Sequence, residues 1–366
     1  MKLFLLIYII CIAFHIGYWL FFYNRLNFYK PLISTEERNT KPISVIIAAK
    51  NEAANLKQNL PKILSQQYAS FEVIVVDDYS TDNSLAVLKS IQANHKNLTI
   101  VEKENFKNNS GKKLALTAAI EKSRFENLLF TDADCTPSSE FWIQKMANHF
   151  IKKDIVLGYG PYSAEPTLLN KFIRYETIIT AMNYFSFALA EMPFMGVGRN
   201  MGYKKSLFIN SSGYSKHLNI ASGDDDLFIS EVANKTNVSI ELSKTAFCYS
   251  IGKNNLLAYI KQKQRHVSTS PSYGIKTKSI LAFYALSHVL IYFSILISIF
   301  LNIFIIAFVI LFVSRGIIQV AIFNKTFKKL DGKDITRYIA LFDCLFIGYY
   351  FLSIPGVFLR NKTQWQ

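Results

Sequence analysis

Two carboxylates stand one residue apart in the stretch NLLFTDADC, where Asp132 and Asp134 flank Ala133. The apolar run just before them predicts a buried strand that ends close to the pair. Carboxylates at this spacing repel each other unless a cation, a proton or a strong donor lies between them. Hard divalent cations such as Mg²⁺ or Mn²⁺ prefer carboxylate oxygens and also bridge phosphates. We therefore predict a divalent metal held by Asp132 and Asp134.

A second acidic pair, Asp77 and Asp78, follows another apolar run, FEVIVV. Taken alone, DDYSTDNS would also suit a turn that caps the next helix, with Ser80 or Thr81 as the N-cap. Ligands of open α/β sheets gather at the carboxyl ends of strands. Because both acidic pairs stand at such ends, we expect them to lie along one edge of a sheet.

The elements that must position these acids alternate in type along the first half of the chain. Apolar, β-branched runs predict strands at 43–49, 71–78, 98–103 and 127–134, with helices at 51–64, 80–93 and 111–123 between them. This alternation predicts a mostly parallel sheet with helices on its faces. The second half is less regular, and strands are expected near 155–159, 198–203 and 238–248.

Long apolar stretches indicate a membrane protein. Of the 366 residues, 51% are hydrophobic, and they concentrate at 3–22, 280–313 and 338–359. The first stretch has about the length of one spanning helix, the second suits two helices that turn near Asn302, and the third suits one more. The residues after the first stretch offer no small-residue cleavage site, which disfavours a signal peptide.

The chain is therefore expected to have three parts: an N-terminal anchor at 1–24, a catalytic domain at 41–275, and a C-terminal membrane region of about three helices at 279–360. The net charge is +15. Basic residues crowd the ends of the apolar stretches: Arg25, Lys30, Arg38, Lys41, Lys261, Lys263, Arg265, Lys276, Lys278, Lys325, Lys328, Lys329 and Lys333. The positive-inside rule then predicts a multi-pass protein of the inner (cytoplasmic) membrane with a cytosolic domain. A nucleic-acid partner is not expected, because no recognition motif accompanies these charges.

Six motifs share the order and spacing of one enzyme family: SVIIAAKNE, VIVVDDYSTDNS, GKKLALTAAI, FTDADC, GDDDLF and QKQRH. With them the chain resembles the inverting family 2 glycosyltransferases, which use nucleotide-sugar donors on a GT-A fold. QKQRH is similar to the QxxRW motif of their membrane-bound members. The resemblance covers roughly residues 41–270. It departs at His266, where tryptophan is usual, and at the Gly-Asp-Asp that replaces a common Glu-Asp pair.

The resemblance implies a role for each motif. Donor-binding residues would be Ala48, Glu52, Asp77, Asp78, Lys112 and Asp132. By register, Asp224 matches the family's catalytic base and Asp225 is the alternative, whereas an acid at a helix start, as expected for Asp226, also suits the helix dipole.

The QKQRH motif would contribute Gln262, Arg265 and His266, which share one helical face. Arg265 would lie near the pyrophosphate and His266 beneath the acceptor. The same face could otherwise be a solvated basic surface next to the membrane.

The function implied is transfer of a sugar, from a UDP-sugar in the first instance, to a lipid or lipid-linked acceptor. Two alternatives stay open. One is a processive polysaccharide synthase, although the 280–313 stretch carries few polar groups beyond His288 and Asn302 to line a channel. The other is a membrane protein that binds nucleotide-sugars without catalysis, against which the intact acidic motifs argue.

Overall fold

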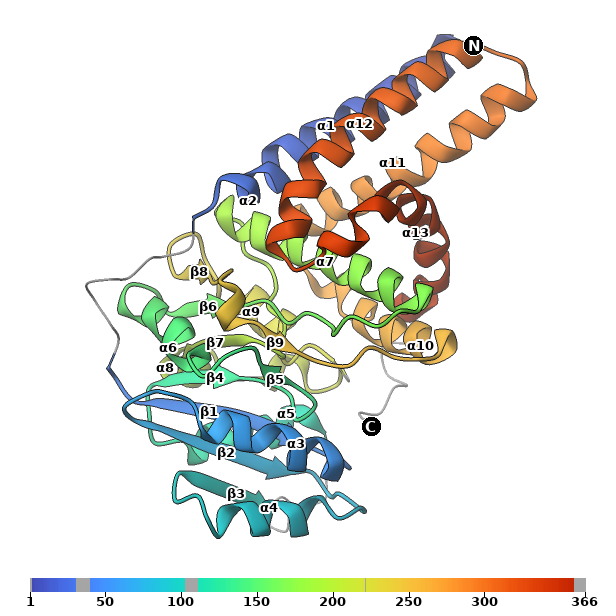
Figure 1. The fold of residues 1–366 in the computed structure, drawn as a ribbon. Helices are drawn as coiled ribbons and strands as arrows, with labels where there is room; N and C mark the ends of the chain where they lie inside the picture. The colour runs from blue at the N-terminus through green and yellow to red at the C-terminus, as the bar shows by residue number, and fades with distance from the viewer. Residues whose placement is uncertain (1, 31–39, 103–110, 221, 359–366) are drawn as a thin grey trace.

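The computed structural model of the protein describes residues 2–30, 40–102, 111–220 and 222–358. A mixed sheet with helices on its faces forms one end of the molecule, and long apolar helices project from the other (Figure 1). Helix α7 (Leu168–Leu189) lies between these two parts. Arg38, one of the basic residues used above for topology, lies outside the described residues.

The sheet of the described residues has seven strands in the order β3-β2-β1-β4-β7-β6-β8. These are β1 (Ile43–Ala49), β2 (Phe71–Asp77), β3 (Leu98–Glu102), β4 (Asn127–Phe130), β6 (Ile155–Leu157), β7 (Met201–Lys204) and β8 (Val238–Ile240). Strand β1 pairs in parallel with β2 and β4, and β2 pairs in parallel with β3, whereas β7 is antiparallel to β4. The mostly parallel sheet expected from the sequence is confirmed, and the carboxyl ends of β1, β2 and β4 share one edge.

Helices cover both faces of this sheet because the side chains of its strands alternate between two cores. The helices of this part are α3 (Ala53–Leu64), α4 (Ser84–Gln92), α5 (Lys112–Lys122), α6 (Trp142–Ala147), α8 (Lys205–Asn210), α9 (Asp226–Val232) and α10 (Leu256–Val267). Val45 and Ile47 of β1 join the core that includes α3 and α6, whereas Ile46 and Ala48 join the core that includes α5, α7 and α9. This is the period of two that a strand imposes on its side chains.

Within the described ranges, four helical segments are long and apolar enough to cross a membrane: Lys2–Phe28, Ile275–Phe300, Ile305–Lys329 and Lys333–Phe358. The first contains α1 (Lys2–Tyr18), a π-helical turn (Trp19–Tyr23) and α2 (Asn24–Phe28). The next two are α11 and α12, and the last contains α13 (Ile339–Ser353) and α14 (Pro355–Phe358). The expected turn near Asn302 is confirmed, since α11 ends at Phe300 and α12 begins at Ile305.

A buried polar cluster joins the long apolar helices. Arg315 of α12 donates to Asp343 of α13 at 2.9 Å, and Gln319 donates to the other carboxylate oxygen at 2.7 Å. His288 and Tyr292 of α11 contact the same carboxylate at 3.2 and 2.8 Å. Helix α12 continues well beyond the expected limit of residue 313 and so brings in Arg315 and Gln319. These polar groups contact one another, which a purely apolar hairpin would not provide.

Two local features differ from expectation. Helix α4 begins after Asn83, not after Ser80 or Thr81, because Asp82 accepts hydrogen bonds from the backbone and hydroxyl of Ser84. Helix α7, 22 residues long, occupies a stretch for which the sequence predicted no regular element.

Candidate active site

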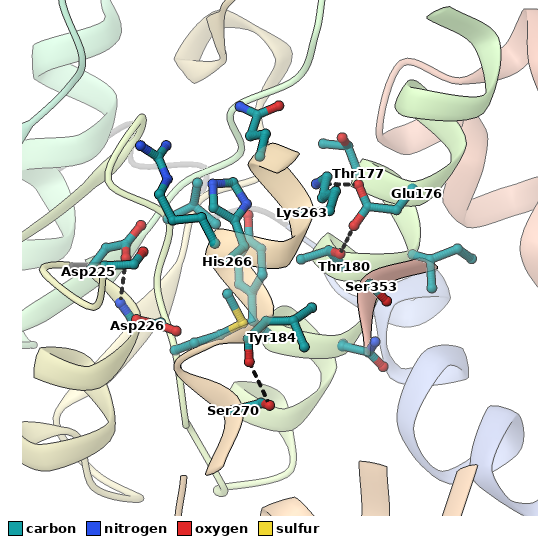
Figure 2. A pocket seen from close by; sticks show the side chains of 18 of the residues that line it. Glu176, Thr177, Thr180, Tyr184, Asp225, Asp226, Lys263, His266, Ser270 and Ser353 are labelled. Atoms are coloured by element: carbon teal, nitrogen blue, oxygen red, sulfur yellow. Dashed lines mark hydrogen bonds and ion pairs between the residues drawn. The ribbon is translucent and has the colours of Figure 1, made fainter. Parts of the chain in front are cut away.

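A cavity of about 810 Å³ extends from the ends of β1 and β4 to the long apolar helices. Its lining comes from the acidic motifs at one end, α10 in the middle, and α7, α11 and α13 at the other end. Figure 2 shows Asp225 on one side of this cavity, Glu176 on the other, and His266 between them. The cavity therefore joins the predicted site to helices that are apolar enough to cross a membrane.

The acidic pair after β4 lines this cavity. Potential ligand atoms of Asp132, Asp134 and Cys135 all lie within 4.8 Å of one another. One oxygen of Asp134 accepts a hydrogen bond from the Ser250 hydroxyl at 2.7 Å. Burial holds the pKa of the Cys135 thiol well above its usual range. The two carboxylates fit a hard cation that prefers oxygen ligands.

Lys112, at the start of α5, joins the two acidic motifs. Its Nζ atom lies 2.9 Å from Asp132 Oδ1 and 3.0 Å from Asp224 Oδ2. Burial would lower the pKa of Lys112, but the carboxylates of Asp132, Asp224 and Asp225 outweigh it and hold that pKa above its usual range. Lys112 is therefore charged in the cavity and balances part of the negative charge there.

The three acids at the start of α9 have different surroundings. Asp225 accepts hydrogen bonds from the backbone N–H groups of Gly198 and Asp226, each at 2.8 Å. Burial, and then the charges of Asp224 and Asp226, raise the pKa of Asp225 to about 7. Asp226 instead accepts hydrogen bonds from the hydroxyls of Thr269 and Tyr273. All three line the cavity, but Asp226 is tied to the segment after α10.

The face of α10 predicted from QKQRH lines the middle of the cavity with Gln262, Arg265 and His266. Gln262 Nε2 donates to the Tyr162 hydroxyl at 3.4 Å. Surrounding protein, and then the charges of Lys263 and Arg265, hold the pKa of His266 well below its usual range, although the ring is open to the cavity. A neutral imidazole can both donate and accept a hydrogen bond.

The predicted donor-binding residues divide into two groups. Ala48 and Glu52 line the cavity, and burial raises the pKa of Glu52. Asp77 and Asp78, at the end of β2, are not among the described residues that line it. Asp77 pairs in register with Ala49 of β1, and its Oδ1 atom is buried without a hydrogen-bond partner among the described residues. This oxygen can accept a hydrogen bond from a ligand at the edge of the sheet.

Sequence reasoning did not single out Arg199, although it lies in the Gly-rich stretch FMGVGRNMGYKKS. Its guanidinium lies 4.2 Å from the centre of the Tyr162 ring, and its Nη1 atom is buried without a hydrogen-bond partner among the described residues. Arg199 lines the cavity, and its charge helps to lower the pKa of Asp132. A single basic residue between two glycines was the signal available in the sequence.

Glycines in such a stretch could permit close approach of a substrate. Instead, a Cβ at Gly202 would lie 2.6 Å from the Leu128 carbonyl oxygen, and one at Gly196 would lie 2.9 Å from Met201 Sδ. These two glycines are required by packing within the protein. Gly198 alone faces the acids, through the hydrogen bond from its N–H to Asp225.

Residues 44–210 match Glycosyl transferase family 2. The chain carries a family 2 glycosyl transferase domain. This match confirms the resemblance over the first four motifs, whereas GDDDLF and QKQRH lie beyond residue 210.

Curated relatives are similar to part of the chain. The poly-β-1,6-N-acetyl-D-glucosamine synthase of Staphylococcus epidermidis is 30% identical over 112 residues, which are 31% of this chain and 25% of that protein. Glycosyltransferase AglE of Haloferax volcanii is 32% identical over 105 residues, which are 28% of this chain and 33% of that protein. The aligned part of the chain thus spans about a quarter to a third of the length of these relatives.

A similar solved structure is the mannosyltransferase PcManGT from Pyrobaculum calidifontis in complex with GDP-Man and Mn²⁺. It has a TM-score of 0.57 and 18% identity, and the match covers 92% of this chain and 98% of that one. At this identity the likeness concerns the fold, and it confirms the GT-A architecture.

Proposed function

We propose that this protein is a membrane-bound, inverting glycosyltransferase that moves a sugar from a nucleotide-sugar, a UDP-sugar in the first instance, to a lipid or lipid-linked acceptor. The observation that carries this proposal is the single cavity that joins Asp132, Asp134 and Asp224 to α11 and α13. A nucleotide-sugar donor and an acceptor held in the membrane can be bound next to each other there.

The donor is assigned to the sheet edge. Asp77 and Glu52, with the backbone at Ala48, would contact the nucleoside, and Arg199 and Arg265 supply positive charge for the diphosphate. Arg199 suits this role because one of its nitrogen atoms is buried without a partner among the described residues. An unpaired buried donor is costly, and a phosphate oxygen would satisfy it.

Asp132 and Asp134 would hold a divalent cation, as the oxygen ligands described above permit. When bound, such a cation neutralises charge that develops on the leaving diphosphate. The Mn²⁺ named with the mannosyltransferase of similar fold supports this assignment.

The transfer itself needs a base on the acceptor side. The acceptor oxygen attacks the anomeric carbon as the bond from that carbon to the diphosphate breaks, and the hydroxyl proton passes to Asp224. Attack on the side opposite the leaving group inverts the anomeric configuration. Lys112, 3.0 Å from Asp224, keeps that carboxylate in place. His266, neutral and open to the cavity, can hydrogen-bond the incoming hydroxyl.

A processive polysaccharide synthase is the second candidate, favoured by the synthase from Staphylococcus epidermidis among the relatives. Such an enzyme would need a polar path across the membrane. Here Arg315, Asp343 and Gln319 contact one another, and none of them is among the described residues that line the cavity. We therefore favour transfer of a single sugar.

The test is to incubate membranes containing the protein with a panel of radiolabelled nucleotide-sugars and to extract the lipids. We expect one labelled, lipid-soluble product of fixed size, which is absent with Asp224→Asn. A ladder or a high-molecular-weight polymer made by the purified protein would favour the synthase. Release of no nucleoside diphosphate from any donor would favour binding without catalysis.

A further inference from the structure

The half of the cavity remote from the acids is lined largely by apolar residues, on helices long enough to cross a membrane. Leu281, Ala285 and Val289 of α11 line one wall, and Phe346 and Tyr350 of α13 line the other. A nucleotide-sugar is polar and charged throughout. This half of the cavity therefore suits a different ligand, one with a hydrocarbon part.

The apolar half reaches the outer surface of the long helices. Leu286 of α11, Phe351 of α13 and Ile354, which follows α13, line the cavity and yet are 55%, 54% and 48% exposed. Exposed apolar residues on these helices would face lipid if the segments cross a membrane, as their length and composition allow. The cavity thus reaches the lipid-facing side of α11 and α13, and a ligand could reach it from the bilayer.

A buried ion pair stands where the polar and apolar halves meet. Glu176 of α7 pairs with Lys263 of α10, and their side chains are only 4% and 9% exposed. The second carboxylate oxygen of Glu176 accepts hydrogen bonds from the hydroxyls of Thr180, at 3.0 Å, and Tyr349, at 3.3 Å. Figure 2 shows Glu176, Lys263 and Thr180 together on the side of the cavity opposite Asp225.

The charge of this group indicates what it would bind. Lys263 is already balanced by Glu176, so the pair has no net charge, and a phosphate placed here would meet a carboxylate. Both residues nevertheless offer strong hydrogen bonds, because bonds to charged groups are stronger than neutral ones. Neutral hydroxyl groups fit such a pair better than an anion does.

We infer that the acceptor is an amphiphile with an uncharged sugar head and a hydrocarbon chain, which enters sideways between α11 and α13. Its head hydroxyls contact Glu176 and Lys263, and its chain lies against Ala285 and Phe346. This inference deepens the proposed function and rests on it. It makes Glu176 a specificity-determining residue, since the pair would select the head group.

The binding route is tested with a photoactivatable alkyl β-glucoside that carries a diazirine in its chain, added to the purified protein in phosphatidylcholine vesicles. We expect labelled peptides from the cavity faces of α11 and α13, with competition by dodecyl β-D-glucoside. Ala285→Trp should abolish this labelling by filling the cavity. Leu296→Trp is the matched control, because Leu296 is on the same helix, 62% exposed and not among the lining residues. Equal labelling of the two variants would overturn the inference.

The head-group role is tested by comparing this probe with a diazirine alkylphosphocholine of equal chain length. Glu176→Gln should reduce glucoside labelling about tenfold relative to the phosphocholine, as expected for loss of a hydrogen bond to a charged group. Tyr349→Phe leaves the charges of Glu176 and Lys263 in place and should reduce glucoside labelling less. This comparison separates a loss of selectivity from misfolding. An unchanged preference in Glu176→Gln would remove Glu176 from the acceptor site.

The two proposals can fail separately. If the parent protein releases no nucleoside diphosphate from any nucleotide-sugar but the cavity is labelled, the catalytic proposal is wrong. If the parent turns over a donor and the cavity is not labelled, the acceptor route is wrong.

Discussion

Lys112 is the residue on which both acidic motifs depend. Its ammonium group contacts Asp132 and Asp224 at nearly equal distances, 2.9 and 3.0 Å. A cation bound to Asp132 would share that carboxylate with Lys112. The charge state of the donor side is therefore linked to the proposed base through one side chain.

The first prediction concerns the acidic pair after β4. Asp132→Asn and Asp134→Asn should each lower transfer by at least about 10²-fold, because metal stabilisation of the leaving group is worth several kcal/mol. The amount of protein in the membrane should not change, since both side chains are partly exposed at the end of a strand. Transfer is measured with the labelled nucleotide-sugar, with and without EDTA. Asp154→Asn is the control, because it breaks only a surface ion pair with Lys204.

Near-normal activity of either variant, or of the parent in EDTA, would contradict the metal assignment.

The second prediction separates Asp224 from Asp225 by pH. The pKa of Asp225 is raised to about 7, so lowering the pH through 7 protonates it and removes a negative charge from beside the proposed base, Asp224. We expect kcat/KM of the parent to fall below about pH 7. Asp225→Asn should lack that limb, because the group that titrates near pH 7 is gone. Asp224→Asn should lose ~10²–10⁴-fold at every pH, as is typical for a general base.

Asp226→Asn tests whether the effect depends on which acid of the group is changed. Asp226 accepts hydrogen bonds from Thr269 and Tyr273, so its substitution should reduce turnover much less. An active Asp224→Asn beside an inactive Asp225→Asn would show that the assignment by register is wrong.

At the scale of elements, the first half of the fold could be predicted because its signals are local. Strands β1 and β4 begin where the runs ISVIIAA and NLLF begin, and each run is buried on both faces. Helix α7 could not be predicted in the same way, because 14 of its 22 residues are buried and no polar stripe marks its period. The role proposed for Glu176 on α7 followed only from its position beside α10 and α13.

The candidate site shows the same division. Asp132, Asp134 and the Asp224–Asp226 group were found because their motifs are compact in the sequence. Arg199 meets Tyr162, and Lys263 meets Glu176, through the packing of segments that are distant in the sequence. No spacing in the sequence predicts these contacts. The second core of the sheet and the polar cluster around Arg315 depend on tertiary contacts in the same way.

The third prediction concerns the buried polar cluster that joins α11, α12 and α13. Asp343→Leu leaves the Arg315 charge unpaired, and breaking a buried ion pair typically costs about 3–5 kcal/mol. We expect a large fall in the thermal unfolding temperature in detergent. The double variant Arg315→Met/Asp343→Leu should recover much of it, because no charge is then left unpaired. Ser314→Ala is the control, since Ser314 is exposed and its hydroxyl donates to the Ile310 carbonyl of its own helix.

A double variant as unstable as Asp343→Leu would show that the polar contacts themselves, and not the balance of charge, stabilise these helices.

At the scale of the whole molecule, the long helices project from the sheet like a stalk (Figure 1). The start of α1 and the turn between α11 and α12 lie at the end remote from the sheet. The basic end of α12 returns to the sheet side, where Lys329 donates to the carbonyl groups of Leu26, Asn27 and Tyr29. This arrangement agrees with the distribution of charge in the sequence.

The fourth prediction is the topology that follows. In a Cys344→Ser background, where Cys11, Cys135 and Cys248 are buried, a membrane-impermeant maleimide should label Asn302→Cys in intact cells. It should label Lys235→Cys, in an exposed turn near the sheet, only after the membrane is opened. The opposite pattern would place the sheet outside the cytosol.

If the acceptor enters the cavity from the bilayer, the concentration that matters in an assay is that of the acceptor within the membrane or micelle. The protein would respond to the mole fraction of acceptor in the surrounding lipid or micelle, not to the amount per volume of buffer. Adding detergent at constant bulk acceptor should therefore slow transfer, and rates from different detergent contents should fall on one curve when plotted against mole fraction. The rate of sugar transfer would then measure the fraction of the membrane lipids that is acceptor.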